Sequence, residues 1–165
     1  MIYAVHKNGE KYLIPIEWKY TETETPFDNS TGKSGQTRLG NYNELIDNSS
    51  FLKNLPSKKG SVYYYTPFYQ LMRQTLWAEQ MIKYKNDEKI KADSFIHVHI
   101  IPDENTVLLN RGYKDNGKKL KDTWVEYLKN EGQYKVIAPM DLLKGIKKSN
   151  YTKLIQYLTE RYWNQ

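Results

Sequence analysis

Glu17 and Lys19 are the two residues whose types and spacing most clearly offer chemistry, and they end a strand-like apolar run that begins at Leu13. In a strand, residues two positions apart project from the same face, so the carboxylate and the ammonium group stand side by side. A carboxylate can hold a divalent cation, and an ammonium group can orient a water molecule and a phosphate oxygen. The pair therefore indicates a metal-dependent phosphodiesterase site.

The same spacing also fits an exposed ion pair on one face of a strand, which is worth only about 0.2–1 kcal/mol. Position in the fold is what favours chemistry at Glu17 and Lys19. Asp87 and Lys89 have the same spacing, but their segment has no apolar period and is typical of a solvated turn.

A polar stripe is predicted on the helix that follows Thr66-Pro67. Gln70, Gln74 and Trp77 follow i, i+4 and i+7, and Arg73 lies beside Trp77. These side chains would suit phosphate and base contacts. The competing interpretation is an ordinary polar flank next to a half-buried tryptophan.

Two further features allow either a structural or a functional interpretation. His97 and His99 share one face of their strand and could ligate a metal, but that strand has no carboxylate at ligand spacing. Histidines satisfied by hydrogen bonds within the sheet are therefore the favoured interpretation.

The chain also has 15 tyrosines, which could stack on bases or form a carbohydrate-binding face. A compositional bias explains them equally well.

The composition of the chain bounds its class. At 165 residues with 39% hydrophobic content, the chain is expected to form a single domain, residues 1–165, with one real core. A net charge of +6 favours a polyanionic partner. The absence of cysteine excludes disulfides and thiolate metal sites. Because no long apolar run is present, a cytoplasmic protein without membrane association is expected.

The chain is expected to open with a β-hairpin around Asn8-Gly9. Further strands alternate with helices, which predicts an α/β fold with a mixed sheet covered on both faces. The expected elements are a loop over 21–40, a broken helix over 42–55, a helix over 66–84, a strand over 92–101, a helix over 121–128, a strand over 134–138, a helical turn over 140–143 and a helix from Ser149.

Taken together, these segments resemble a bacterial branch of the PD-(D/E)xK restriction-endonuclease-like superfamily. The likeness covers nearly the whole chain. It rests on Ile16-Glu17-Trp18-Lys19-Tyr20-Thr21-Glu22, Pro67-Phe68-Tyr69-Gln70-Leu71-Met72-Arg73-Gln74, Ile100-Ile101-Pro102, Ala138-Pro139-Met140-Asp141-Leu142-Leu143 and Tyr157-Leu158-Thr159-Glu160-Arg161-Tyr162-Trp163.

The resemblance implies a restriction-endonuclease-like mixed sheet flanked by helices and a DNA endonuclease that uses Mg²⁺ or Mn²⁺. Glu17 would bind the metal together with the backbone carbonyl of Trp18, and Lys19 would orient the attacking water. Gln70 would match a helix glutamine beside the site. Arg73, Gln74 and Trp77 would then contact nucleic acid, with DNA as the expected partner.

One departure from the superfamily bears on activity, because the family pattern requires an aspartate on the strand before Glu17 and residues 1–6 contain no acid. With a two-residue turn at Asn8-Gly9, Ile2 faces Pro15, and the partner of Glu17 falls just before Met1. The expectation is a chain that starts too late, inactive in this form and catalytic when complete. An in-frame upstream aspartate would distinguish it from the alternative, a DNA-binding or regulatory protein that keeps the fold without cutting.

Overall fold

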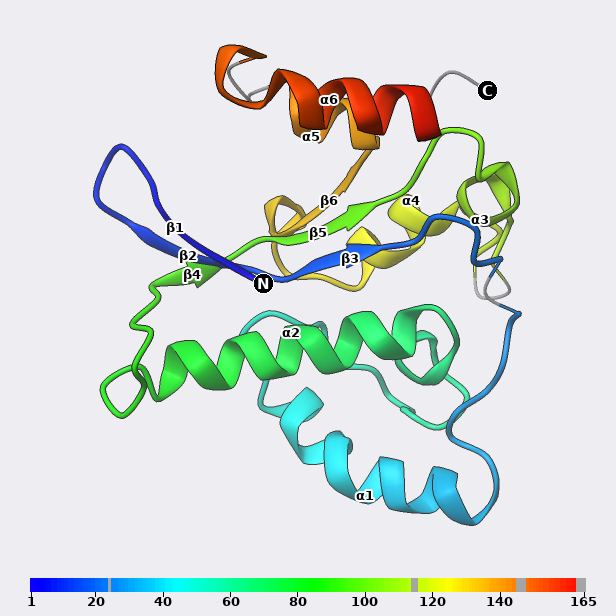
Figure 1. Ribbon diagram of the computed structural model, residues 1–165. Coiled ribbons are helices and arrows are strands. Elements are labelled where there is room, and N and C mark those ends of the chain that lie inside the picture. The colour runs from blue at the N-terminus through cyan, green and yellow to red at the C-terminus, as the bar shows by residue number, and fades with distance from the viewer. Residues whose placement is uncertain (24, 114–115, 145–147, 163–165) are drawn as a thin grey trace.

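The computed structural model describes residues 1–23, 25–113, 116–144 and 148–162, and it has an α/β architecture. A layer of strands lies between α1 and α2 on one side and α5 and α6 on the other (Figure 1). The elements are β1 (Ile2–Val5), β2 (Lys11–Ile14), β3 (Ile16–Trp18), α1 (Gly32–Asp47), η1 (Val62–Tyr64), α2 (Phe68–Lys83), β4 (Ser94–Phe95), β5 (His97–Ile100), α3 (Thr106–Asn110), α4 (Leu120–Glu126), η2 (Glu131–Gln133), β6 (Tyr134–Ile137), α5 (Pro139–Leu143) and α6 (Lys148–Tyr162). The α/β prediction is confirmed.

The chain opens with the expected antiparallel hairpin of β1 and β2, but its register differs by one residue from the predicted one. Ile2 pairs with Ile14 rather than facing Pro15. The cause is the turn: the N–H of His6 donates to the carbonyl of Glu10, which leaves a three-residue connection in place of two. Gly9 permits this connection because its φ of 88° lies in the left-handed region.

The described residues form two three-stranded sheets, β1-β2-β4 and β3-β5-β6, and the segment 11–18 contributes β2 to the first and β3 to the second. Each of its paired residues faces the residue 82 positions later, before Pro15 (Tyr12 with Ser94) and after it (Glu17 with His99). Pro15 has no N–H to donate, but its carbonyl still accepts from the N–H of Val98 at 2.9 Å. The parallel pairings of β2 with β4 and of β3 with β5 thus keep one register across Pro15.

Helix α2 forms where the sequence predicts it, because its apolar residues recur on one face. Phe68, Leu71, Met72 and Leu76 are at most 2% exposed. The ring of Phe68 stacks on that of Trp124, with centroids 6.0 Å apart. This packing fixes α2 beneath the sheet and holds its polar flank next to β3.

Helix α1 begins at Gly32, inside the segment expected to be a loop over 21–40, so that prediction is wrong from residue 32 onward. The segment has few apolar residues, and only Gly35 and Ile46 are buried. Its helical state therefore depends on docking against the core rather than on propensity. Of the broken helix predicted over 42–55, only the first part is confirmed: it is the end of α1, which stops at Asp47, and residues 48–55 are not helical.

The remaining elements follow the predicted order with two differences. The strand expected over 92–101 is divided into β4 and β5, and α3 was not predicted. In α6, Ile155 and Leu158 are half-buried, whereas Tyr151 and Leu154 are exposed. Across the described segments, no helix combines the length and apolar character that crossing a membrane requires.

Candidate active site

Glu17 lies in β3 and Lys19 immediately follows it, and both are only 8% exposed. The strand geometry points both side chains to the same side, and Lys19 Nζ lies 2.5 Å from Glu17 Oε1. The backbone N–H of Lys19 also donates to the carbonyl of Ile100, which extends the parallel ladder. Glu17 and Lys19 therefore form a buried ion pair at the end of β3. The exposed ion pair considered as an alternative is not what the structure contains.

Two glutamines of α2, the helix that faces the side chains of this ion pair, contact its two members. Lys19 Nζ donates to Gln70 Oε1 at 3.2 Å, and Gln74 Nε2 donates to Glu17 Oε2 at 3.3 Å. One helical turn separates the two glutamines, so each can contact one member of the pair. The structure thus brings Glu17, Lys19, Gln70 and Gln74 together.

The carboxylate of Glu17 stays ionised in this environment. Burial alone would raise its pKa, but hydrogen bonds and charge from His99 and Lys19 outweigh burial and lower the pKa to about 2. The two oxygens divide their partners: Oε1 faces Lys19, while Oε2 faces His99 and Gln74. The carboxylate of Glu17 is therefore negatively charged at neutral pH, and its two oxygens have different partners.

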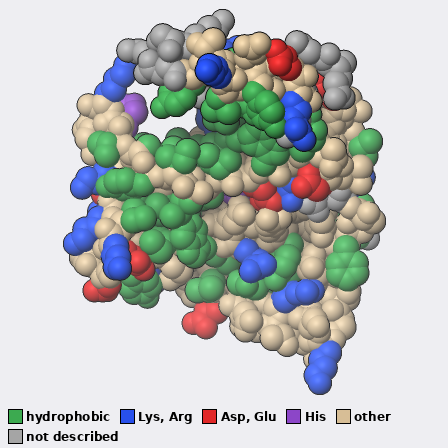
Figure 2. Space-filling model, in the orientation of Figure 1, with side chains coloured by type: hydrophobic (Ala, Val, Ile, Leu, Met, Phe, Trp, Pro, Cys, Tyr) green, Lys and Arg blue, Asp and Glu red, His purple; other side chains and the backbone are tan. Residues whose placement is uncertain are grey.

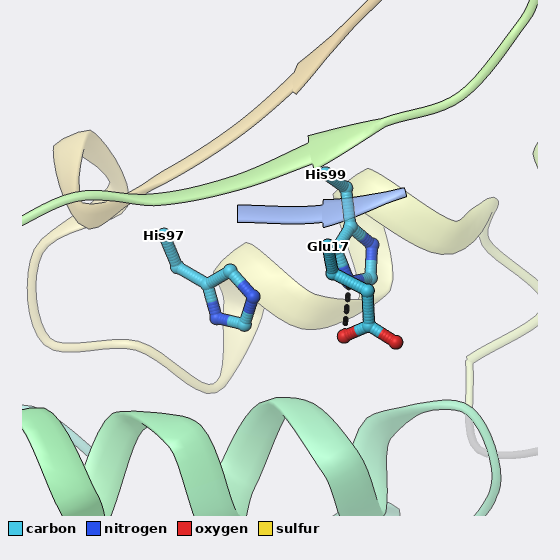
Figure 3. Close-up of side chains that lie close together, drawn as sticks. All are labelled: Glu17, His97 and His99. Carbon is cyan, nitrogen blue, oxygen red and sulfur yellow. Dashed lines mark hydrogen bonds and ion pairs between the residues drawn. The ribbon is translucent and has the colours of Figure 1, made fainter. Parts of the chain in front are cut away.

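His97 and His99 of β5 point from the sheet toward α2, on the same side as Glu17 (Figure 3). His99 Nε2 lies 3.2 Å from Glu17 Oε2, and His99 Nδ1 lies 3.0 Å from the hydroxyl of Tyr134. Both ring nitrogens of His97 are buried without a hydrogen-bond partner among the described residues. The prediction of two satisfied histidines is therefore wrong for His97.

The other predicted site residues lie around this centre. Trp18 has an exposed side chain, and its backbone pairs with Ile100. Arg73 lies with its guanidinium 5.5 Å from the ring centroid of Tyr69, and Trp77 is 41% exposed. A groove of about 450 Å³ runs between α1 and α2, lined by Tyr42, Leu45, Gln70, Arg73, Gln74, Leu76, Trp77 and Gln80.

Sequence reasoning did not join the histidines to Glu17. Their ligand atoms lie within 4.8 Å of those of Glu17, although the histidines come from a different strand and follow Glu17 by 80 positions or more along the chain. The strand that carries the histidines contains no carboxylate, so its own sequence gives no sign of Glu17. Aligning the two buried strands in parallel, with Glu17 opposite His99, would have predicted the contact.

The donor set bears on which metal ion the site suits. Mg²⁺ prefers oxygen ligands in octahedral geometry, whereas imidazole nitrogen suits ions such as Zn²⁺. Here one carboxylate and two imidazoles face one another. Because two of these three ligands are imidazoles, the set fits a nitrogen-preferring ion better than Mg²⁺.

A family model described as "Restriction Endonuclease associating with ARP" matches residues 2–163. No curated protein and no solved structure matches the chain.

Proposed function

Because the chain belongs to the family described as "Restriction Endonuclease associating with ARP", we propose that it is a metal-dependent nuclease that hydrolyses phosphodiester bonds of DNA. The predicted relation to restriction-endonuclease-like proteins is confirmed by that membership, and the α/β architecture is compatible with their fold. Family membership supports a nuclease-like function in general. The reaction, its substrate and the roles of individual residues belong to the proposal.

The observation that carries the proposal is the placement of Lys19 between Glu17 and Gln70. Its Nζ lies 2.5 Å from Glu17 Oε1 and 3.2 Å from Gln70 Oε1. An ammonium group held in this way is oriented before substrate arrives, which lowers the cost of ordering it in the transition state. Gln70 is the positioning residue in this arrangement.

Hydrolysis requires water to attack phosphorus while the bond from phosphorus to the leaving sugar oxygen breaks. Lys19 would orient that water and stabilise the negative charge that develops on the phosphoryl oxygens. Glu17 would supply the carboxylate that anchors a divalent ion through Oε2, and the ion, when bound, supplies an acidified water. In this scheme Lys19 keeps its contact with Oε1.

The groove between α1 and α2 is where we place the DNA backbone. Gln70 and Gln74 line this groove and also contact the Glu17–Lys19 pair. The guanidinium groups of Arg38 and Arg73 lie 5.6 and 5.5 Å from the ring centroid of Tyr69. Figure 2 shows basic side chains with hydrophobic ones between them over the part of the surface formed by α1 and α2. Arginines held against a ring suit phosphate contacts.

A plasmid-nicking assay with titrated divalent metal tests the proposal. In contrast to the inactivity expected from the missing strand aspartate, this proposal requires the wild-type chain to nick supercoiled plasmid. Glu17→Gln and Lys19→Ala should each abolish nicking while plasmid binding persists. Glu22→Gln is the matched control, because Glu22 is an exposed acid beyond the ion pair. Nicking that survives Glu17→Gln would show that the active site lies elsewhere.

A non-catalytic DNA-binding protein with a nuclease fold is the second candidate. It is favoured by the ligand group Glu17, His97 and His99, which contains a single carboxylate and so lacks the second acid that the superfamily pattern requires. Salt-sensitive plasmid binding without nicking, under every metal tested, would support this candidate over the enzyme.

A further inference from the structure

Three buried residues from neighbouring strands form a ligand set that the proposed mechanism uses only in part. Glu17, His97 and His99 are 8%, 1% and 1% exposed, and one ligand atom from each lies within 4.8 Å of the others. Figure 3 shows the three side chains converging on the side of the sheet that faces α2. Two histidines and one glutamate are a set that holds catalytic zinc in proteins, with a fourth position left for water.

The spacing of two members already suits such an ion. A tetrahedral ion with bonds of about 2.0–2.1 Å separates its ligand atoms by about 3.3 Å. His99 Nε2 and Glu17 Oε2 lie 3.2 Å apart. Lys19 contacts the other oxygen of Glu17, so Oε2 can take an ion without displacing the ammonium group.

His97 is the most informative member, because nothing else satisfies it. Both of its nitrogens are buried without a hydrogen-bond partner in the described residues. Gln74 Oε1, whose amide nitrogen contacts Glu17 Oε2, is in the same state. An unsatisfied buried polar atom destabilises the fold, because the hydrogen bonds that it made to water in the unfolded chain are not replaced. A bound ion with its water would offer a partner to a nitrogen of His97 and to the Gln74 oxygen.

The hydroxyl of Tyr134 supports His99 from the side away from Glu17. The Nδ1 of His99 lies 3.0 Å from the hydroxyl of Tyr134, which is buried in β6. When His99 Nε2 binds an ion, Nδ1 carries the proton and donates it to the Tyr134 oxygen. Metal-bound histidines almost always make such a contact through their other nitrogen.

We propose that Glu17, His97 and His99 form a site for one Zn²⁺-class transition-metal ion, which the chain binds in preference to Mg²⁺. The inference deepens the proposed function: it rests on that function for the ion's role in catalysis, but the binding itself stands on the three side chains alone. The metal that serves the site would then differ from the Mg²⁺ expected from the superfamily.

Metal binding by the EDTA-treated full chain tests the inference without reference to cleavage. Calorimetric titration should show one Zn²⁺ per chain, undisturbed by Mg²⁺ at millimolar concentration. His97→Ala and His99→Ala should each weaken binding by more than tenfold, and Tyr134→Phe by about 10–100-fold. His6→Ala is the matched control, because His6 is the remaining histidine of the chain and is exposed, and it should bind as the wild type does.

X-ray absorption of the zinc-loaded wild type keeps the inference testable if a variant fails to fold. Two imidazole nitrogens in a four-coordinate shell are expected, whereas a shell of oxygens alone would overturn the inference. Unchanged Zn²⁺ affinity in folded His97→Ala, or displacement of Zn²⁺ by Mg²⁺, would also overturn it. If zinc binds as expected but no metal supports nicking, the nuclease proposal is rejected and the zinc site is retained. If Mg²⁺ supports nicking that survives His97→Ala and zinc does not bind, the zinc site is rejected and the nuclease proposal is retained.

Discussion

Glu17 and His99 occupy facing positions on two parallel strands, and their side chains meet where Glu17 Oε2 lies 3.2 Å from His99 Nε2. The relationship is a consequence of register: a shift of one residue would move His99 to the other face of the sheet. The interruption at Pro15 leaves that register unchanged. The site is therefore built by strand pairing first and completed by the glutamines of α2.

Gln70→Ala should slow DNA nicking about tenfold while leaving DNA affinity close to that of the wild type. Gln70 Oε1 accepts from Lys19 Nζ at 3.2 Å, and a hydrogen bond to a charged group contributes about 1.5–3 kcal/mol. Its loss would leave Lys19 less well oriented. Initial nicking rates at saturating protein measure the effect. Gln156→Ala is the control, because Gln156 lies on α6 on the other side of the sheet. Equal losses in both variants would remove Gln70 from the site.

Arg73→Ala should make DNA binding less sensitive to salt. Each phosphate contact releases condensed counterions, so the loss of one contact should reduce the slope of log affinity against log salt by about one unit. Fluorescence anisotropy with a short duplex, over a series of salt concentrations, measures that slope. Lys7→Ala at the exposed hairpin tip also removes one positive charge, but outside the groove it should leave the slope unchanged. A slope that shifts equally in both variants would mean that net charge, not a contact at Arg73, sets the affinity.

The parts of the fold that could be predicted from sequence are those whose residues carry their own pattern. Helix α2 was predicted because its apolar residues recur at helical spacing and are buried as expected, from Phe68 to Leu76. Helix α1 was missed up to residue 40, because Gly32 and Gly35 lower helix propensity and only Ile46 supplies a fully buried apolar side chain. Docking against the core decides its state, and no local pattern reports docking.

The candidate site divides in the same way. Glu17 and Lys19 could be singled out because both lie at the end of one strand, and Gln70 because it lies on one stripe of a helix and in a segment of family likeness. The contact of His97 and His99 with Glu17 is set by which strands are neighbours. Tyr134 joins through a further strand. Non-local pairing of this kind has no signature in spacing along the chain.

Tyr63→Phe should reduce the loss of stability at alkaline pH. Tyr63 is fully buried, and burial, followed by the influence of Tyr127, raises its pKa well above 10. The hydroxyl also donates to the carbonyl of Tyr127 at 3.2 Å. The folded state thus keeps the Tyr63 proton at a pH where the unfolded chain releases it. This contribution to stability is complete below pH 10 and is lost as pH rises above it.

Between pH 9 and pH 11, the free energy of unfolding of the wild type should therefore fall by roughly 1 kcal/mol more than that of Tyr63→Phe. Urea denaturation at the two pH values measures this difference. Tyr84→Phe is the control, because Tyr84 is 50% exposed and should show the pH dependence of the wild type. If Tyr63→Phe tracks the wild type at both pH values, the hydroxyl of Tyr63 ionises equally in both states.

Gly35→Ala and Gly40→Ala should change stability in opposite directions, although both place alanine in α1. A Cβ at Gly35 would overlap the backbone of Ser30, which leads into the helix. Relief requires the backbone to move, and overpacking of this kind costs about 1–3 kcal/mol.

Gly40 is exposed, and an added Cβ meets no atom of the described residues within 4 Å. Alanine there should stabilise the protein by about 0.5–1 kcal/mol through its higher helix propensity. Thermal or urea denaturation of the two variants measures the signs, and stabilisation by both would mean that α1 is not packed against Ser30. Because α1 also forms one wall of the groove through Tyr42 and Leu45, Gly35→Ala should additionally weaken DNA binding, whereas Gly40→Ala should not.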